Sequence, residues 1–268
     1  MRQRFVVLCT VMLAVLVAAA SISAEPKGLK KKRMQPDEYG NVILYNRIRA
    51  QSESPVVFKH WLHRSKYTCR LCHVDVGFSM EEGRTGISCE DIKEGLYCGS
   101  CHNGNESFSR DGVSKINGVE VKNCDRCHSF GKNVPEKHEF QKFKQIFKPE
   151  RFGNGLDWLR AEKYGRIKLK DFLPGVSIAR EKLNDPKDSL ILPRVHEKNL
   201  MPGIIFSHEK HAVWSGCELC HPEIFEVNKS EEAFSMQDVF DGKFCGACHG
   251  TVAFPNIDCR RCHTKEVY

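Results

Sequence analysis

Six copies of one short pattern constrain this 268-residue chain more than any other feature: two cysteines, separated by two residues and followed directly by a histidine. The copies are Cys69-Arg-Leu-Cys72-His73, Cys98-Gly-Ser-Cys101-His102, Cys124-Asp-Arg-Cys127-His128, Cys217-Glu-Leu-Cys220-His221, Cys245-Gly-Ala-Cys248-His249 and Cys259-Arg-Arg-Cys262-His263. Disulfide frameworks need no histidine beside each cysteine pair, and zinc ribbons do not place one after every pair. The pattern therefore disfavours both of these uses of cysteine.

The spacing is instead typical of covalent haem attachment. Two thiols one helical turn apart can form thioethers with the two vinyl groups of one haem, and the next residue then offers its imidazole to the iron. Six motifs predict six covalently attached haem c groups. Only 41 % of the residues are hydrophobic, against ~45–50 % in ordinary domains. We therefore expect a mostly irregular, haem-cored fold with short α-helices at the motifs and minimal β-structure.

The chain carries an internal duplication. Phe58-Lys-His60-Trp-Leu-His63 matches Phe206-Ser-His208-Glu-Lys-His211, and in both copies the second histidine precedes the first motif cysteine by six residues. Phe78 and Phe225 recur twenty residues before the second motif, and Phe108 and Phe254 follow it at similar distances. Copy one carries about twelve extra residues before its third motif, near 109–121. Agreement of residue types and offsets predicts two repeated trihaem units.

The N-terminus has the pattern of a secretory signal. Arg2 and Arg4 precede an apolar run from Phe5 to Ala20, and small residues follow up to Ala24. Cleavage there would leave 39 basic and 34 acidic residues, a formal charge of +5. An uncut segment would be long enough to anchor the chain in a bilayer. We expect an exported, periplasmic protein. The basic run at 27–33 is interpreted as a solvated, flexible tail, with attraction to anionic lipid or an acidic partner as the alternative.

These features predict the following organisation: a signal peptide over 1–24, an N-terminal extension over 25–54, trihaem domains over 55–130 and 203–268, and a haem-free helical insert over 131–202. The insert has a helical pattern in Phe140, Phe143 and Phe147, and a second helix is expected from near Asp157. We interpret its aromatic residues as packing on haem faces or between the units. Residues 41–48 and 189–192 are candidate short strands.

Six histidines lie outside the motifs, and they are the candidates for the second axial position of each iron. His60, His63, His208 and His211 form two matching pairs on one helical face, so each member of a pair can reach a different haem. His138 and His196 are not equivalent in the repeat. The soft donors Met80, Cys89 and Met236 compete with them, and methionine ligation would raise a haem potential. Packing or a free thiol is the alternative role for these three.

The pattern F-x-H-x-x-H followed by three C-x-x-C-H motifs resembles the trihaem (c-seven) class of periplasmic cytochromes, which is similar to the tetrahaem class III cytochromes c. The resemblance implies that His60 pairs with His73, His63 with His102, His208 with His221 and His211 with His249. The class usually has a third distal histidine between the first and second motifs. This sequence has none there, so the ligands opposite His128 and His263 are open among His138, His196, Met80, Cys89 and Met236.

Iron with two protein ligands has no vacant position for a substrate, which favours an electron carrier over an enzyme. The expected partners are other redox proteins, namely a quinol-oxidising membrane complex and other multihaem cytochromes. Two propionates per haem would offset the positive chain, so the basic residues do not indicate nucleic-acid binding. Two alternatives remain: a multihaem reductase with one open iron, and a subunit of a cytochrome filament or conduit.

Overall fold

The computed structural model describes residues 34–45, 53–136, 138–178, 189–192, 202–227 and 234–265. The chain divides into two units, Met1–Met34 and Gln35–Tyr268, and every element named below belongs to the second. The expected signal segment lies outside the described residues. Within them, no helix has the length and apolar character needed to cross a membrane.

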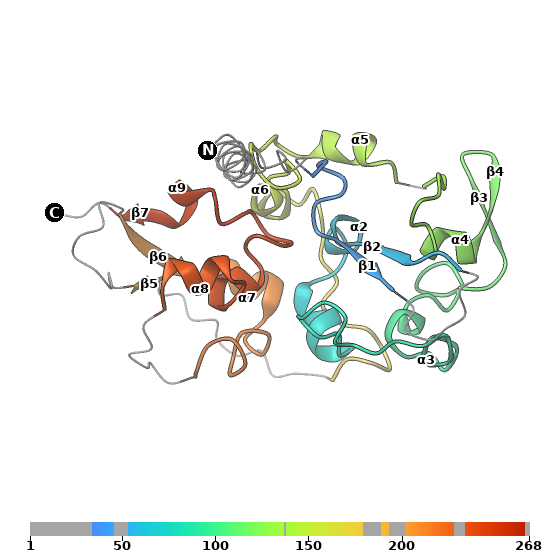
Figure 1. Ribbon diagram of the computed structural model, residues 1–268, viewed down its shortest axis with the longest axis horizontal. Helices are drawn as coiled ribbons and strands as arrows, with labels where there is room; N and C mark the ends of the chain where they lie inside the picture. The colour runs from blue at the N-terminus through green and yellow to red at the C-terminus, as the bar shows by residue number, and fades with distance from the viewer. Residues whose placement is uncertain are drawn as a thin grey trace, which may run out of the picture. The chain divides into compact units, whose positions relative to one another are not determined.

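Each repeat begins with a pair of antiparallel strands. In the first, β1 (Asn41–Leu44) pairs with β2 (Val56–Lys59), and in the second, β5 (Ser189–Leu192) pairs with β6 (Gly203–Ser207). The registers are equivalent, since Leu44 faces Val56 and Leu192 faces Ile204. The candidate strands of the sequence thus form, and β1, from the predicted N-terminal extension, pairs with the first repeat (Figure 1).

A histidine-bearing helix follows each second strand directly. These helices are α2 (His60–Arg64) and α7 (His208–Ser215), and α7 is the longest helix among the described residues, with eight residues. The remaining helices are η1 (Leu71–Asp75), α3 (Cys89–Lys93), η2 (Tyr97–Ser100), α4 (Asn123–Cys127), α5 (Phe140–Phe143), η3 (Lys144–Ile146), α6 (Trp158–Lys163), α8 (Met236–Phe240), η4 (Phe244–Ala247) and α9 (Cys259–Cys262). Short helices separated by loops confirm the fold class expected from the sequence.

The same local device precedes the second motif of both repeats. Ser88 caps α3 in a capping box with Asp91, and Ser235 caps α8 in the same way with Asp238. Such a box satisfies two otherwise unpaired backbone N–H groups and fixes where the helix begins. Cys89 and Met236 are therefore structurally equivalent first helical residues, and each lies nine residues before the first cysteine of its second motif.

A tight backbone approach then brings each second motif against that helix. Tyr97 and Phe244 start η2 and η4 with positive φ angles of 49° and 50°. Two residues on, a Cβ on Gly99 would collide with the carbonyl oxygen of Ile92. Gly246 meets Val239 in the same way. Glycine is required at both positions because the helix backbone occupies the space of a side chain.

The extra residues of copy one form a β-hairpin. Strand β3 (Val113–Ile116) pairs with β4 (Val119–Lys122) around Asn117-Gly118. Both turn residues have positive φ, at 50° and 83°, which is the geometry that an Asn-Gly hairpin turn favours. The second repeat instead ends in strand β7 (His263–Lys265), which pairs with β6.

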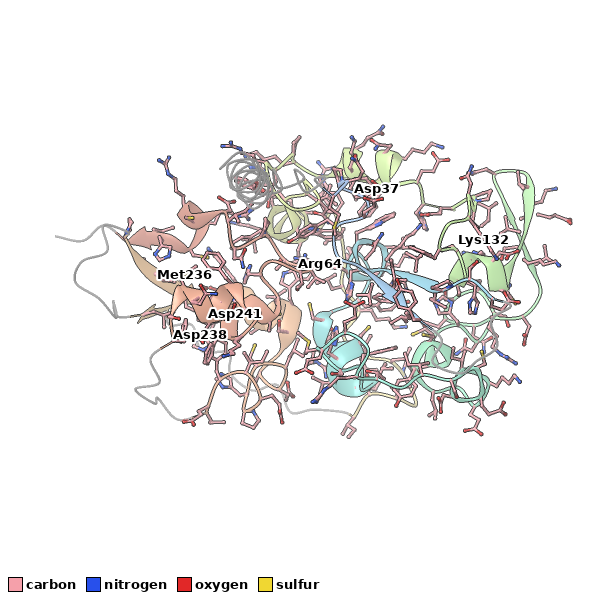
Figure 2. All side chains as sticks on the ribbon, viewed as in Figure 1. Asp37, Arg64, Lys132, Met236, Asp238 and Asp241 are labelled. Atoms are coloured by element: carbon pink, nitrogen blue, oxygen red, sulfur yellow. The ribbon has the colours of Figure 1, made fainter. Side chains whose placement is uncertain are left out.

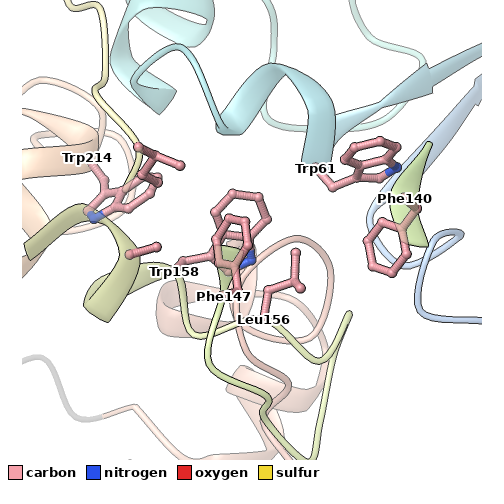
Figure 3. Packing of buried hydrophobic residues seen from close by; sticks show 8 residues of the cluster. Trp61, Phe140, Phe147, Leu156, Trp158 and Trp214 are labelled. Carbon is pink, nitrogen blue, oxygen red and sulfur yellow. The ribbon is translucent and has the colours of Figure 1, made fainter. Parts of the chain in front are cut away.

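The segment between the repeats supplies most of the side-chain core. Its aromatic residues form a buried cluster with one tryptophan from each repeat (Figure 3). The cluster consists of Trp61, Phe140, Phe147, Leu156, Trp158, Ala161, Ile167 and Trp214. Trp61 meets Phe140 edge to face at 5.2 Å, and Trp158 meets Trp214 edge to face at 6.4 Å between centroids. The predicted packing of this segment between the units is confirmed, as are its two helices.

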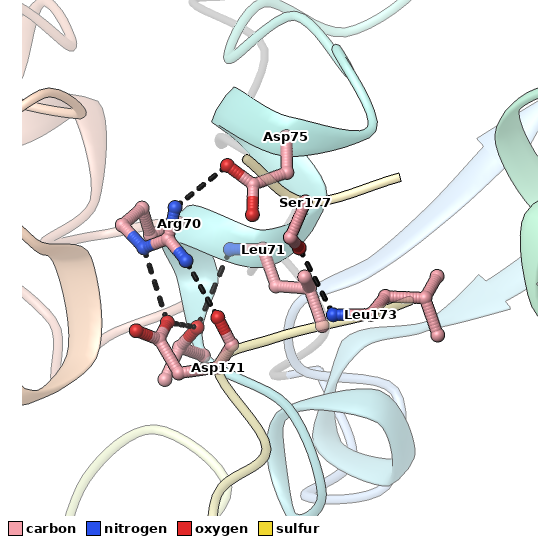
Figure 4. Close-up of polar contacts among 7 residues, drawn as sticks. Arg70, Leu71, Asp75, Asp171, Leu173 and Ser177 are labelled. Carbon is pink, nitrogen blue, oxygen red and sulfur yellow. Dashed lines mark hydrogen bonds and ion pairs between the residues drawn. The ribbon is translucent and has the colours of Figure 1, made fainter. Parts of the chain in front are cut away.

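The segment between the repeats, residues 131–202, is called the linker below, and the buried Arg70 side chain ties it to the first motif. Arg70 is 3 % exposed and binds Asp75 at 2.6 Å and Asp171 at 3.1 Å (Figure 4). It also donates to the backbone carbonyl of Asp171 at 2.6 Å, and Thr68 donates to the Asp171 carboxylate. Because each hydrogen bond to the buried guanidinium is charge-assisted, this contact fixes residues near 171 against the first motif.

Candidate haem-binding sites

Five of the six motifs overlap a short helix, and the fourth forms turns after α7. The spacing i, i+3 and i+4 within such a turn places the two thiols and the histidine on one side. The histidine N–H donates to the carbonyl of the first cysteine in the second, third, fourth and fifth motifs, at 2.8, 2.8, 3.0 and 2.9 Å. Across the described residues, all thirteen cysteines carry free thiols. This is the local geometry that two thioether bonds to one macrocycle require.

Most of the motif thiols are sheltered from solvent. Burial raises the pKa of Cys98 and Cys245 to about 11, and that of Cys72 and Cys248 to about 12. These thiols are therefore protonated at neutral pH, unlike the thiolates of catalytic cysteines. Nor does the described part of the chain bring three His, Cys, Asp or Glu side chains together as a metal-binding group. Sheltered cysteine pairs with a histidine directly after them fit covalent attachment of a cofactor.

All six motif histidines share one hydrogen-bonding pattern: ring nitrogen Nδ1 faces a backbone carbonyl oxygen. The acceptors are Phe78 for His73 (2.9 Å), Phe108 for His102 (3.2 Å), Ser54 for His128 (2.6 Å), Phe225 for His221 (2.8 Å), Phe254 for His249 (3.0 Å) and Pro202 for His263 (2.7 Å). Donation from Nδ1–H fixes the tautomer and leaves the Nε2 lone pair free for a metal.

These acceptors also show that the duplication is three-dimensional. The first-motif histidines use Phe78 and Phe225, which the sequence aligned on spacing alone. The third-motif histidines both reach back to the residue four positions before the phenylalanine of their repeat's strand–helix segment: Ser54 before Phe58, and Pro202 before Phe206. The third motif therefore closes each unit onto its own beginning.

The histidines outside the motifs face motif histidines across a regular gap. Ring centres of His60 and His73 are 6.5 Å apart and nearly parallel, at 5°. His63 and His102 are 6.3 Å apart, and so are His211 and His249. Two metal–imidazole bonds of about 2 Å, plus roughly 1 Å from each nitrogen to its ring centre, put two ligand rings about 6 Å apart across one ion. The gap thus fits one iron between each pair.

The distal rings are held in the state that a ligand needs. His63 and His211 hold their Nδ1 atoms at 2.9 and 2.8 Å from the carbonyls of Lys59 and Ser207. Burial lowers the pKa of His60, His63 and His249 to about 4, so these imidazoles are neutral at pH 7. A neutral imidazole keeps the lone pair with which it binds iron.

An aromatic ring orients each histidine pair. Phe58 stacks on His63 at 4.4 Å and 29°, and Phe206 stacks on His211 at 4.3 Å and 26°. The same two phenylalanines meet His60 and His208 edge to face. Sequence comparison found these phenylalanines as part of the repeat, and the structure adds their role as supports of the imidazoles.

The other candidate ligands stand apart from this arrangement. Cys89 and His138 are exposed, Met80 is half-buried, and Met236 is 40 % exposed at the start of α8 (Figure 2). His196 lies outside the described residues. The structure therefore brings together the predicted ligands of the first two motifs of copy one and of the second motif of copy two.

One recurring feature of the third motifs escaped the sequence argument. The Arg126 guanidinium lies 3.4 Å from the centre of the Phe108 ring, and Arg261 lies 4.3 Å from that of Phe254. Each arginine precedes the second cysteine of its motif. That repetition was a readable signal, and it ties the third motif to the phenylalanine that orients the second-motif histidine.

The family model described as "Cytochrome c7 and related cytochrome c" matches residues 56–129 and 204–264, together just over half of the chain. The chain belongs to this family. It carries covalently attached haem c, and the class of protein that fold and motifs define is a multihaem c-type cytochrome that transfers electrons.

Similar solved structures include those of the cytochrome GSU1996. Its C-terminal hexahaem fragment is 23 % identical and covers 86 % of this chain and 99 % of that one, with a TM-score of 0.25. The dodecahaem protein itself is 21 % identical and covers 84 % of this chain and 73 % of that one, also with a TM-score of 0.25. No curated protein gave a match.

Proposed function

We propose that this protein is an exported hexahaem electron carrier, with three haem groups held by each repeat. Haem c, when bound, supplies an iron that cycles between ferric and ferrous states. The polypeptide fixes each group through two cysteines and excludes substrates from the iron by filling both axial positions with histidine. The observation that carries this proposal is the gap of 6.3–6.5 Å between three pairs of imidazoles.

The proposed axial pairs are His60 with His73, His63 with His102, His208 with His221 and His211 with His249. For the third motifs, whose proximal ligands are His128 and His263, we rank His138 and His196 first, followed by Met80, Cys89 and Met236. Histidine on both sides leaves the geometry at the iron nearly unchanged when one electron arrives. A small rearrangement favours fast exchange of electrons with partners.

Motif thiols of neighbouring sites, in both repeats, interact electrostatically with one another. Besides burial, neighbouring thiols raise the pKa of Cys72 (Cys101, Cys69 and Cys98) and of Cys98 (Cys127 and Cys101). Cys69 of the first repeat raises that of Cys220 and Cys248 in the second, and Cys262 raises that of Cys245. This continuity supports electron hopping through both repeats.

We further propose that the carrier works in the periplasm, between a quinol-oxidising membrane complex and other multihaem cytochromes or terminal acceptors. The signal-like pattern of Met1 to Ala24 supports export, and the basic run at 27–33 supports contact with an anionic membrane surface.

Carbon monoxide binding to the reduced protein, combined with low-temperature EPR of the oxidised protein, tests the proposal. We expect low-spin EPR signals and no haem that binds carbon monoxide. Carbon monoxide binding together with a high-spin signal would instead indicate the reductase alternative, with an open iron at the third motif of a repeat.

A further inference from the structure

Arg64, the last residue of α2, joins the two repeats and the segment between them. Its guanidinium carbon lies 4.7 Å from the ring centre of Trp158 and 4.8 Å from that of Trp214. Its Nη1 donates to the carbonyl oxygen of Val252, 2.8 Å away in the second repeat. Arg64, a residue of the first repeat, thus contacts the linker through Trp158 and the second repeat through Trp214 and Val252 (Figure 2).

The charge of Arg64 has no carboxylate partner within the described part of the chain. No ion pair joins it to an Asp or Glu there, and its Nε–H is buried without a hydrogen-bond acceptor. Its two indole neighbours attract a cation, but they do not neutralise it. Removing an ion from water costs several kcal/mol when the ion is unpaired. A charge retained at such a cost calls for an electrostatic role.

Two haem-binding motifs lie within reach of that charge. Val252, whose carbonyl accepts from Arg64, donates its own N–H to the carbonyl of Cys248 in the fifth motif, 3.1 Å away. Cys69 of the first motif packs against the cluster that contains Trp158 and Trp214, the two rings beneath the guanidinium. Arg64 is therefore placed between one binding site in each repeat.

The second repeat does not carry this charge. Arg64 directly follows the second histidine of its pair, His63, and the residue in the same place after His211 is Ala212. At this position the duplication therefore places a half-buried guanidinium in the first repeat and none in the second.

We propose that Arg64 sets the reduction potential at the junction, favouring the ferrous state of the haem groups held by the first and fifth motifs. This inference rests on the proposed hexahaem function. One electron lowers the charge of a ferric centre by one unit, and a nearby fixed cation stabilises the product, more strongly in a low-dielectric interior than in water. Electrons that enter either repeat then favour the haem groups of the first and fifth motifs, where they can pass to the other repeat.

Redox titration of the fully loaded protein, followed by visible spectra and by EPR of the separate low-spin signals, tests this role. Arg64→Met and Arg64→Gln both remove the charge, and the glutamine retains a donor for Val252. We expect the ferrous-to-ferric ratio of two haem groups, at a fixed ambient potential, to fall at least about tenfold, which is 59 mV for a one-electron couple. Arg64→Lys keeps the charge and should keep both potentials.

The matched control is Arg84→Gln, which removes the same charge from an exposed side chain paired with Glu81. It should leave every potential unchanged. A neutral variant at position 64 that holds all its haem groups with unaltered potentials overturns the inference, as does an equal shift in the control. A purely structural role would lower stability without moving a potential. A wild-type protein with fewer than six haem groups would instead count against the proposed function itself.

Discussion

The two repeats hold their motifs with the same local devices, yet they bury different amounts of side chain. Both have a strand pair in the same register, a phenylalanine stacked on the second histidine, a capping box and a glycine pressed against a helix carbonyl. Among the described residues, the equivalent leucines Leu71 and Leu219 are both buried, at 1 % and 6 % exposed. The repeats differ at Trp61, which is 2 % exposed where the second repeat has the exposed Glu209, and at Arg70, which two aspartates fix.

The difference separates what binds a cofactor from what joins the repeats. The shared features all lie within reach of a motif histidine or a motif helix, so they position the ligands. The features of the first repeat alone, Trp61, Arg64 and Arg70, all contact the linker, and Arg64 also reaches the second repeat. Divergence after duplication is thus concentrated at the junction and at the linker.

The largest effect is expected from loss of a distal ligand, and it tests whether the two repeats bind iron in the same way. His63→Ala and His211→Ala should each open one iron, because each removes an imidazole 6.3 Å from its motif partner. We expect one haem in each variant to become high-spin and to bind carbon monoxide when reduced.

The two ligand variants should agree in spin state and in carbon monoxide binding. His138→Ala is measured beside them, because His138 has no equivalent in the other repeat. If His211→Ala binds no carbon monoxide while His63→Ala does, the two repeats do not ligate iron alike.

The next effect concerns the glycine in each second motif. Gly99→Ala and Gly246→Ala place a methyl group into the carbonyls of Ile92 and Val239. Backbone must move to accommodate it, at a cost of about 3 kcal/mol in the free energy of unfolding, near the top of the range for overpacking. Guanidinium unfolding of the two variants should give similar losses. Gly86→Ala, where a Cβ would meet nothing within 4 Å, is the control, and a loss as large there would contradict this explanation.

A smaller effect should distinguish the repeats. Asp171→Asn weakens the contact of the linker with the buried Arg70. The second repeat cannot make this contact, because the residue equivalent to Arg70 there is the acidic Glu218. We expect a loss of about 2 kcal/mol in unfolding free energy, because a buried charge loses part of its partnership.

Proteolysis should then cut the linker near 171 faster than wild type. Asp125→Asn, which breaks the more exposed pair with Lys132, should cost less than about 1 kcal/mol. Equal losses in the two variants would show that the linker contact is an ordinary surface pair.

The smallest effect belongs to the capping boxes. Ser88→Ala and Ser235→Ala each remove the side chain that accepts from the third residue of the helix, Asp91 or Asp238. Each change should cost about 1 kcal/mol. Ser88→Thr and Ser235→Thr, which retain the hydroxyl, should recover most of it. Differing losses for the two alanine variants, measured by chemical unfolding, would mean that the two helices are not equivalent.

The sequence was sufficient to predict the motifs, the duplication, the candidate strands and the helices of the linker, because each depends on residues close together in the chain. It aligned Phe78 with Phe225 by spacing, and the structure shows why: both carbonyls accept from a first-motif histidine. The resemblance to the c-seven class, rather than the spacing alone, implied the three imidazole pairs that the structure brings together.

Contacts between distant segments could not be predicted in the same way. Arg64 reaches Val252, and Tyr39 donates to the carbonyl of Ala253 at 2.6 Å, across more than 180 residues. No periodicity or motif encodes such pairs, since they depend on how the repeats pack. The hairpin at Asn117-Gly118 could have been predicted from the sequence, because these two residue types favour the positive φ angles of a tight hairpin turn.

Intact and peptide mass spectrometry of the denatured holoprotein tests the central claim most directly. Protein matured in a cell that attaches haem c should carry six covalent haem groups, and digestion should release three haem-bearing peptides from 55–130 and three from 203–268. A polypeptide at its bare mass, or haem peptides from one repeat only, would contradict the account.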